Sequence, residues 1–270
     1  MHEDVNDTWL RRFGPPLEGG VRLICFPHAG GAASAYVSLA RALAPDVEVL
    51  AVQYPGRQDR RHEPPVEDVD RLADLVAEAL PTESGRPYAL FGHSMGSVVA
   101  YETALRLARD GRRGPSRFFA SGRGAPSLGP GRSDGLRGDA ALTAEIRRLG
   151  GSRGVLDDPE LMAMILPALR SDYRALGSYS WAAGPRLHCP ISVLIGDADP
   201  LVTPDEARTW LDHAADDDGD GTGGTMRVFS GGHFYIDGRV TEVAAAIGED
   251  LRQHIDKDNE LTEGATIVGV

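Results

Sequence analysis

The chain has 270 residues and a formal net charge of -12 at pH 7, with 28 Lys and Arg against 40 Asp and Glu. This acidic excess argues against a nucleic-acid binder, because affinity for phosphate backbones comes mainly from Lys and Arg. The first residues lack the basic and apolar regions of a signal peptide, and no run of about 18 apolar residues could span a bilayer. We therefore expect a cytoplasmic protein with neither nucleic acid nor membrane as a partner, and a single domain as the simplest organisation.

The predicted elements alternate between strand and helix along most of the chain. Such alternation indicates a mostly parallel sheet with helices on both faces, and the nearly continuous apolar strands fit burial on both sides. In chain order the strands are expected at 21–27, 47–55, 88–92, 117–122, 191–196 and 226–230, and the helices at 34–44, 66–80, 97–109, 204–214 and 240–255.

One stretch, residues 128–185, interrupts the alternation. It contains two helix-like segments, DAALTAEIRRLG and DPELMAMILPALRSDYRAL, set among Gly and Pro. Because a structureless loop of this length would be unusual, we interpret it as a helical insertion in a single domain spanning 1–256. Met162, Met164 and Leu166 could form a flexible apolar wall of the active site, or they could pack in an ordinary helix core.

Three features of the chain carry no predicted chemistry. Cys25 and Cys189 fit no metal-binding spacing, so we expect buried thiols. The acidic segment 216–224 resembles a calcium loop, but its twelfth position is Arg227 rather than a bidentate carboxylate, which favours a solvated loop. Residues 257–270 are expected to form a flexible tail. Neither a metal nor a cofactor is predicted.

Two serines lie at the centre of a G-x-S-x-G pattern, Ser94 and Ser152. A nucleophile elbow needs a strand before the serine, glycines in the sharp turn and a helix after it. Ser94 has all three, because YALFG precedes it and an apolar helical stripe follows it. Ser152 follows a helix-like segment, and its glycines resemble a helix end. The context favours Ser94 as the nucleophile.

A serine nucleophile needs a general base and a group that orients the base. In an α/β hydrolase the acid follows a late strand and the histidine follows the last strand. His233 occupies the second position in VFSGGHFYIDG. The turn IGDADP offers Asp197 and Asp199; Asp199 is favoured, because the first aspartate of such a turn more often satisfies turn amides.

Acyl transfer also requires donors for the oxyanion of the tetrahedral intermediate. These are usually the backbone N–H after the nucleophile and another from the loop after an early strand. By position the donors are the amides of Met95 and of Ala29, the latter in FPHAGG. The alternative interpretation of AGG is an ordinary strand-to-helix turn.

Six motifs stand in a fixed order along the chain: CFPHAGG, YPGRQDRRHEPP, LFGHSMG, LPALRSDYRAL, GDADP and GGHFY. In order and spacing they resemble the type II thioesterases of polyketide and nonribosomal peptide synthase systems, with actinomycete polyketide members closest. The resemblance implies the α/β-hydrolase fold, a lid at 128–185 and a triad of Ser94, Asp199 and His233. It also implies hydrolysis of aberrant or decarboxylated acyl groups from the phosphopantetheine arm of acyl carrier proteins, with synthase modules as partners. The acidic insert at 216–224 and the tail depart from the pattern.

Two rival functions remain at this point, a general carboxylesterase or lipase and a non-catalytic hydrolase-fold binding protein. The first methionine without a leading linker leads us to expect a free-standing protein rather than an excised terminal domain. Because both the chain and carrier proteins are acidic, docking would need a local basic patch. Arg57, Arg60 and Arg61 are the candidates, and a solvated charged loop is the alternative.

Overall fold

The computed structural model describes residues 8–17, 19–81, 86–151, 157–215 and 224–252. Seven strands in this part of the chain form one sheet in the order β1-β3-β2-β4-β5-β6-β7, and every pair is parallel except β1 with β3. The mostly parallel sheet is therefore confirmed. The strands are β1 (Leu10–Arg12), β2 (Val21–Phe26), β3 (Val47–Val52), β4 (Tyr88–His93), β5 (Arg117–Ser121), β6 (Ile191–Gly196) and β7 (Gly224–Phe229).

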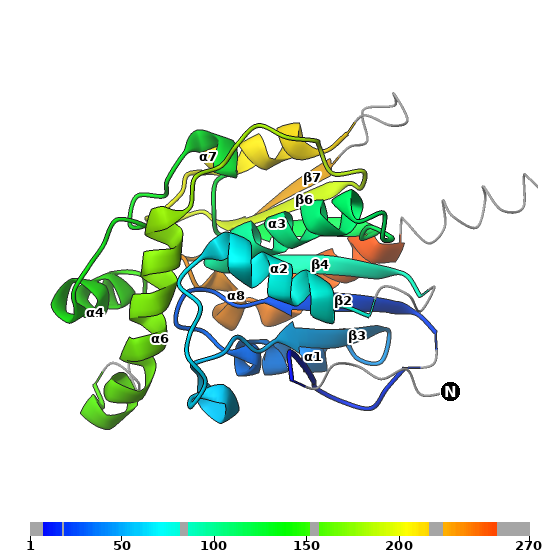
Figure 1. Ribbon diagram of the computed structural model, residues 1–270. Helices are drawn as coiled ribbons and strands as arrows, with labels where there is room; N and C mark the ends of the chain where they lie inside the picture. The colour runs from blue at the N-terminus through cyan, green and yellow to red at the C-terminus, as the bar shows by residue number, and fades with distance from the viewer. Residues whose placement is uncertain (1–7, 18, 82–85, 152–156, 216–223, 253–270) are drawn as a thin grey trace, which may run out of the picture.

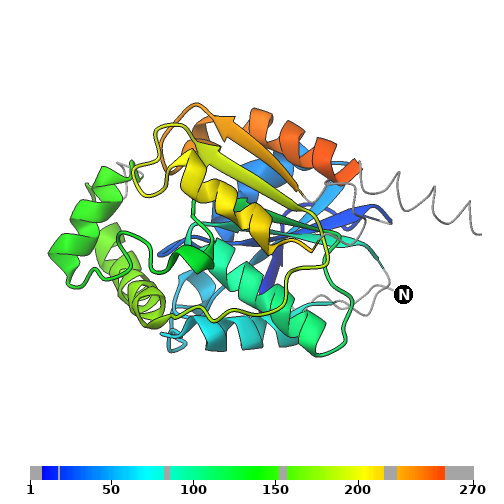
Figure 2. The same cartoon turned by 90° about the horizontal axis from the view of Figure 1, so that it is seen from above.

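Helices cover both faces of the sheet (Figures 1 and 2). Apolar residues of α2 and α3 pack in one core cluster, whereas those of α1 and the helix at 240–252 pack in the other. The α-helices are α1 (Val37–Leu43), α2 (Val69–Ala79), α3 (Met95–Arg109), α4 (Asp139–Arg148), α6 (Pro159–Ser178), α7 (Pro204–Arg208), α8 (Tyr235–Gly238) and the helix at 240–252, and short 3-10 helices lie at Ala33–Tyr36, Gln58–Arg60, Pro126–Leu128 and Thr209–His213.

Two differences from the predicted elements have simple causes. The edge strand β1 was not predicted, because three residues reading LRR are too short for an alternating pattern. The single helix predicted at 204–214 is divided into α7 and a 3-10 helix that begins at Thr209. Strands β2 to β6 are buried along their whole length, as their continuous apolar runs predict, whereas the edge strand β7 is partly exposed.

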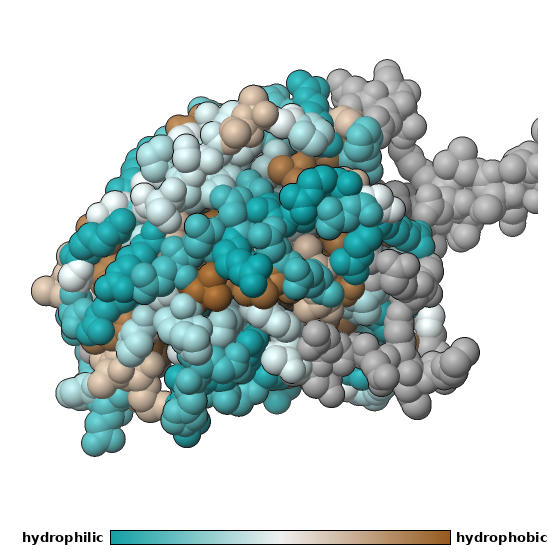
Figure 3. All heavy atoms as spheres, in the orientation of Figure 1, coloured by the Kyte–Doolittle hydropathy of each residue, from teal (hydrophilic) through white to brown (hydrophobic). Residues whose placement is uncertain are grey.

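The inserted segment lies between β5 and β6 and contributes α4 and α6. Figure 1 shows α6 crossing beyond the ends of the strands, with α4 outside it. Asp158 begins α6 by accepting hydrogen bonds from the amides of Glu160 and Leu161, and Pro159 occupies the first turn, where no N–H is needed. The face seen in Figure 3 is mostly hydrophilic, with hydrophobic residues in small separate groups.

Both cysteines are buried and free, which confirms that prediction, and burial raises the pKa of the Cys189 thiol to about 12. No helix within the described ranges has the length and apolarity needed to cross a membrane. Across those same ranges, no cluster of His, Cys, Asp and Glu could hold a metal ion. Ser152, residues 216–223 of the acidic segment, and the predicted tail lie outside the described residues.

Candidate active site

Ser94 occupies the sharp turn between β4 and α3. Its backbone has φ 56° and ψ -118°, a conformation that a residue with a side chain rarely adopts. Strain of this kind costs about 1–3 kcal/mol and persists only where the surrounding structure holds it. The amide of Ser94 donates a 2.8 Å hydrogen bond to the carbonyl of Ser121 at the end of β5. The serine is therefore fixed at the carboxyl edge of the sheet.

The flanking glycines allow the backbone to crowd together in this turn. A Cβ placed on Gly92 would lie 2.3 Å from the carbonyl oxygen of Gly96, and one placed on Gly96 would lie 2.0 Å from that of Phe26. Real Cβ atoms do not approach backbone atoms so closely. The two glycines of the motif are thus required sterically, because α3 begins directly against β2 and β4.

Asp199 and His233 form a buried pair on the loops after β6 and β7. His233 Nδ1 donates to Asp199 Oδ2 at 2.8 Å, and the side chains are 1% and 0% exposed respectively. The second carboxylate oxygen accepts from the amide of Leu201 at 2.8 Å. Asp197 instead accepts from the amide of Gly231, so it braces the loop that carries His233. This arrangement leaves Nε2 as the nitrogen of His233 that can take a proton.

The His233 ring lies near the Ser94 turn. Its centroid is 5.0 Å from that of His93, the residue immediately before Ser94, and its edge faces Gly122 at the end of β5. Among the described residues, no hydrogen bond joins Ser94 Oγ to His233. Catalytic hydrogen bonds are often long without substrate and tighten only when it binds, so this geometry does not exclude His233 as the base.

Ser94 opens into a cavity of about 140 Å³. Strand-end loops and the inserted segment both line it. Its apolar lining includes Ala29, Leu128, Tyr173, Leu176 and Val202.

Met95 directly follows Ser94 at the start of α3, and Ala29 lies on the loop after β2, the strand that pairs with β4. The first amides of a helix have no acceptor within it. Neither of these two amides donates to an acceptor in the part of the chain that the structure describes. Donors left open beside a cavity can bind an anion or an oxyanion.

Two histidines that the sequence motifs did not predict as site residues, His28 and His93, lie beside the site. The His28 ring contacts Phe234 edge-on at a centroid distance of 4.9 Å and lies 6.0 Å from His93, which is 3% exposed. Burial, followed by the charges of His233 and Arg57, lowers the pKa of His28 to about 4. Burial likewise holds the pKa of His93 well below its ordinary value. Their positions beside the two motif turns could have identified them.

The predicted apolar wall of the inserted segment is wrong. None of the three predicted residues lines the cavity. Met162 is buried and Leu166 packs against the main core, in agreement with the alternative of helix-core packing, whereas Met164 is 63% exposed. The cavity residues of α6 are Tyr173 and Leu176, about two to three turns further along the helix. The apolar run suggested the wrong part of α6, because helix burial depends on which face meets the neighbours.

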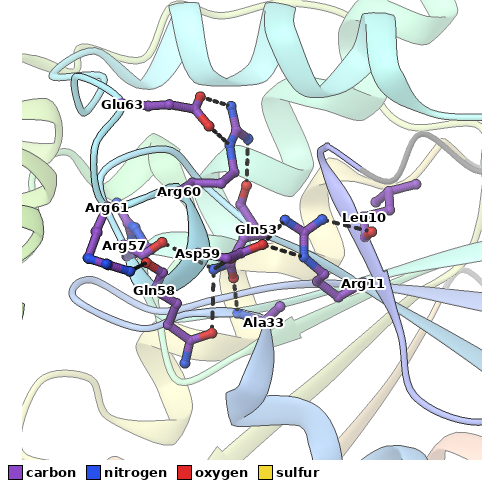
Figure 4. A network of polar contacts seen from close by, with 10 residues as sticks. All are labelled: Leu10, Arg11, Ala33, Gln53, Arg57, Gln58, Asp59, Arg60, Arg61 and Glu63. Atoms are coloured by element: carbon purple, nitrogen blue, oxygen red, sulfur yellow. Dashed lines mark hydrogen bonds and ion pairs between the residues drawn. The ribbon is translucent and has the colours of Figure 1, made fainter.

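The predicted basic patch is also wrong for two of its three arginines. Arg57 is 5% exposed and binds Asp172, while Arg60 is 7% exposed, binds Glu63 and stacks over the Trp9 ring. Figure 4 shows Arg60 directed to Glu63 and to the Gln53 carbonyl. Arg61 is exposed and donates to the Gln58 carbonyl at 3.4 Å, and its role in docking stays a prediction.

The described residues form a seven-stranded, mostly parallel sheet, with a strained serine after a central strand and an Asp–His pair on later loops. These features define an α/β hydrolase. Comparison with known proteins then gives the family. A family model described as "Thioesterase domain" matches residues 21–251. The chain belongs to this thioesterase family and is a thioester hydrolase.

Relatives of the chain come from biosynthetic pathways. It is 46% identical over 254 residues to the probable cadicidin biosynthesis thioesterase of Streptomyces griseus, covering 92% of this chain and 68% of that protein. It is 44% identical to thioesterase PikA5 of Streptomyces venezuelae, covering 90% and 85%. The structure of the type II thioesterase BorB from the borrelidin biosynthetic cluster matches with a TM-score of 0.80 at 45% identity, covering 93% and 99%.

Proposed function

We propose that the chain is a stand-alone type II thioesterase that removes aberrant or decarboxylated acyl groups from the phosphopantetheine arm of acyl carrier proteins in polyketide biosynthesis. The observation that carries the proposal is the buried Asp199–His233 pair beside the strained Ser94, in a chain of the thioesterase family. The similarity to BorB, a type II thioesterase, over 93% of this chain supports the type II assignment.

In the proposed mechanism, Ser94 Oγ attacks the thioester carbonyl carbon while His233 Nε2 takes the hydroxyl proton. The tetrahedral oxyanion is stabilised by the amides of Ala29 and Met95. His233 then returns the proton to the departing pantetheine sulfur as the C–S bond breaks, which leaves an acyl ester on Ser94. A water molecule, deprotonated by His233, attacks that ester, and His233 passes this proton to the departing Ser94 Oγ, which releases the carboxylic acid and restores the serine hydroxyl. Asp199 orients His233 and stabilises its cation.

The cavity supports a broad acyl specificity. Its apolar wall includes Leu128, Leu176 and Val202, and each buried methylene contributes about 0.8 kcal/mol to binding. Such a wall separates neighbouring short acyl chains by only a few-fold per carbon. We infer that carrier proteins and the synthase modules that bear them supply most of the recognition, which suits an editing enzyme that meets varied stalled groups.

The proposal is tested with a panel of carrier proteins bearing C2 to C8 acyl groups, followed by intact-protein mass spectrometry. We expect loss of the acyl mass from every short-chain carrier and no loss with Ser94→Ala. The same acyl groups as p-nitrophenyl esters form the comparison. Faster turnover of the esters than of the carriers would favour a general carboxylesterase, and a sharp thousandfold optimum at one acyl group would favour a dedicated product-releasing enzyme.

A further inference from the structure

A second buried aspartate, Asp172, lies at the same edge of the sheet as the Asp199–His233 pair. It belongs to α6, and its side chain is 0% exposed. Its carboxylate receives both terminal nitrogens of Arg57, at 2.8 and 2.9 Å. Two parallel charge-assisted bonds of this kind fix orientation as well as distance. The proposed mechanism does not use either residue.

Both residues of the ion pair form hydrogen bonds with the backbone of the loop after β2. Asp172 Oδ2 accepts a 2.7 Å hydrogen bond from the amide of Gly30, and Arg57 Nη1 donates to the carbonyl of Gly31 at 3.0 Å. These groups directly follow Ala29, whose amide is the proposed oxyanion donor. The turn is closed by a 2.9 Å bond from the Gly31 amide to the His28 carbonyl.

The same turn fits closely against α6. Gly30 has φ +75°, and a Cβ at this position would lie 2.9 Å from a methyl carbon of Leu169, one helical turn before Asp172. Asp172 and Leu169 therefore hold Gly30 from a single face of α6, one by a hydrogen bond and the other by contact.

Arg57 is itself held in place by the turn after β3. The fully buried Gln53 donates to the Arg57 carbonyl at 3.3 Å and accepts from the amide of Ala33 at 2.8 Å (Figure 4). Gln53 thus links the Arg57 turn to the far end of the loop that carries Ala29. The guanidinium also lies over the Tyr54 ring, 5.0 Å from its centroid.

We propose that Asp172 and Arg57 are positioning residues that set the Ala29 amide for the oxyanion and make that setting depend on the seating of α6. Three segments meet at this pair, the loop after β2, the turn after β3 and the inserted helix. With α6 seated, the Gly30 amide is bound and the loop conformation is fixed. When α6 is displaced, the Asp172 carboxylate moves away from the Gly30 amide. The loop after β2 then loses this restraint, and the Ala29 amide is no longer held in position for the oxyanion. This inference rests on the proposed function.

The test compares Asp172→Asn with wild type, using an acyl-carrier thioester and the matching p-nitrophenyl ester. Active sites are counted by complete labelling with a fluorophosphonate, so kcat is expressed per folded site. We expect kcat to fall by about 100-fold for both substrates, because removal of one oxyanion donor costs about 10²–10³-fold, while KM changes by less than about threefold. The inhibition constant of an alkyl boronic acid, which forms a tetrahedral adduct on Ser94, should rise by a similar factor.

The matched control is Asp250→Asn. Asp250, on the helix at 240–252, is also buried and accepts from Ser192, Thr225 and Arg227. Ser192 and Thr225 lie at the starts of β6 and β7, the edge of the sheet opposite to the active site. We expect it to lower the melting temperature and leave kcat per labelled site unchanged. Arg57→Lys keeps the cation without the two parallel bonds and provides a second variant, with kcat expected to fall by about tenfold.

Unchanged kcat per site and unchanged boronic acid affinity in both Asp172→Asn and Arg57→Lys would overturn the positioning role and leave the proposed function intact. If Asp172→Asn does not fold, Arg57→Lys decides by the same two readouts. A wild-type protein that hydrolyses the ester but no acyl-carrier thioester contradicts the proposed substrate, while the ester measurements still decide the role of Asp172.

Discussion

The strand-end loops and the inserted segment line the same cavity, but they hold their residues in different ways. On the loops, Ser94 is strained and the Asp199–His233 pair is almost completely buried. In the inserted segment, Met164 and Leu161 of α6 are 63% and 40% exposed. The loops inherit their positions from parallel strands, whereas α6 lies beyond the strand ends and is bound to the loops through the buried carboxylate of Asp172, which accepts from Arg57 and from the Gly30 amide.

This difference suggests a division of roles between the two regions. The loops after parallel strands converge at one edge of the sheet, where precise positioning of reacting groups is possible. The inserted segment contributes Tyr173 and Leu176 as apolar wall and Asp172 as a polar link. Substitutions in the loops should therefore lower the rates of the chemical steps. Substitutions in the inserted segment should change acyl selectivity or weaken the contact of Asp172 with the loop after β2.

The largest effect is expected from Ser94. Ser94→Ala and Ser94→Gly should both lower kcat by about 10⁶-fold, the loss seen when a triad serine is removed. Ser94→Gly should also unfold at a higher temperature than Ser94→Ala, because glycine adopts positive φ without the steric penalty. Steady-state kinetics and thermal unfolding measure the two effects. Substantial turnover in either variant would remove Ser94 as the nucleophile.

A smaller loss is expected from the orienting acid. Asp199→Asn should lower kcat by about 10⁴-fold, because an amide favours the wrong tautomer of His233. Asp197→Asn serves as the control, since Asp197 bonds the Gly231 amide and should change kcat by less than about tenfold. The reverse ranking in the same kinetic assay would assign the acid to Asp197.

The inserted segment should act on selectivity. Leu176→Trp should lower kcat/KM for the C6 and C8 carriers by about 10- to 100-fold relative to C2, because a larger side chain fills the cavity. Met164→Trp is the matched control, and its exposed position predicts a profile within about twofold of wild type. A profile that moves with Met164 and not with Leu176 would mean that α6 rotates or shifts when substrate binds.

The smallest effect concerns the pH dependence of stability. Because the folded pKa of His28 is about 4 and its ordinary value is 6.5, the unfolded chain binds a proton that the folded chain does not between these pH values. The contribution of the neutral, buried His28 to the free energy of unfolding is therefore fully present above pH 6.5 and is lost as the pH falls towards 4. His28→Gln should reduce the loss of unfolding free energy between pH 7 and 4.5 by on the order of 1–2 kcal/mol. Identical pH profiles from denaturant unfolding would contradict this.

Much of the sheet could be predicted from local patterns. The apolar runs at 47–55, 88–92, 117–122 and 191–196 each correspond to a strand, because burial on both faces leaves a continuous signal. The sharp turn at Ser94 followed from its glycines, whose steric role the structure explains. Asp197 and Asp199 were both recognised as candidates, because the order of strands placed their turn at the carboxyl edge of the sheet.

Only the tertiary structure decided which side chains of the remaining motifs face the cavity, the core or solvent. Arg57 and Asp172 stand 115 positions apart, and their pairing depends on how α6 lies over the strand ends. The same packing exposes Met164 and turns Leu176 to the cavity. By itself, the sequence determined the chain order of strands β2 to β7, of the helices between them and of the chemically active residue types, since these follow from local periodicity and turn chemistry. The partners of Arg57 and the wall of the cavity follow from contacts between distant segments, which no local pattern encodes.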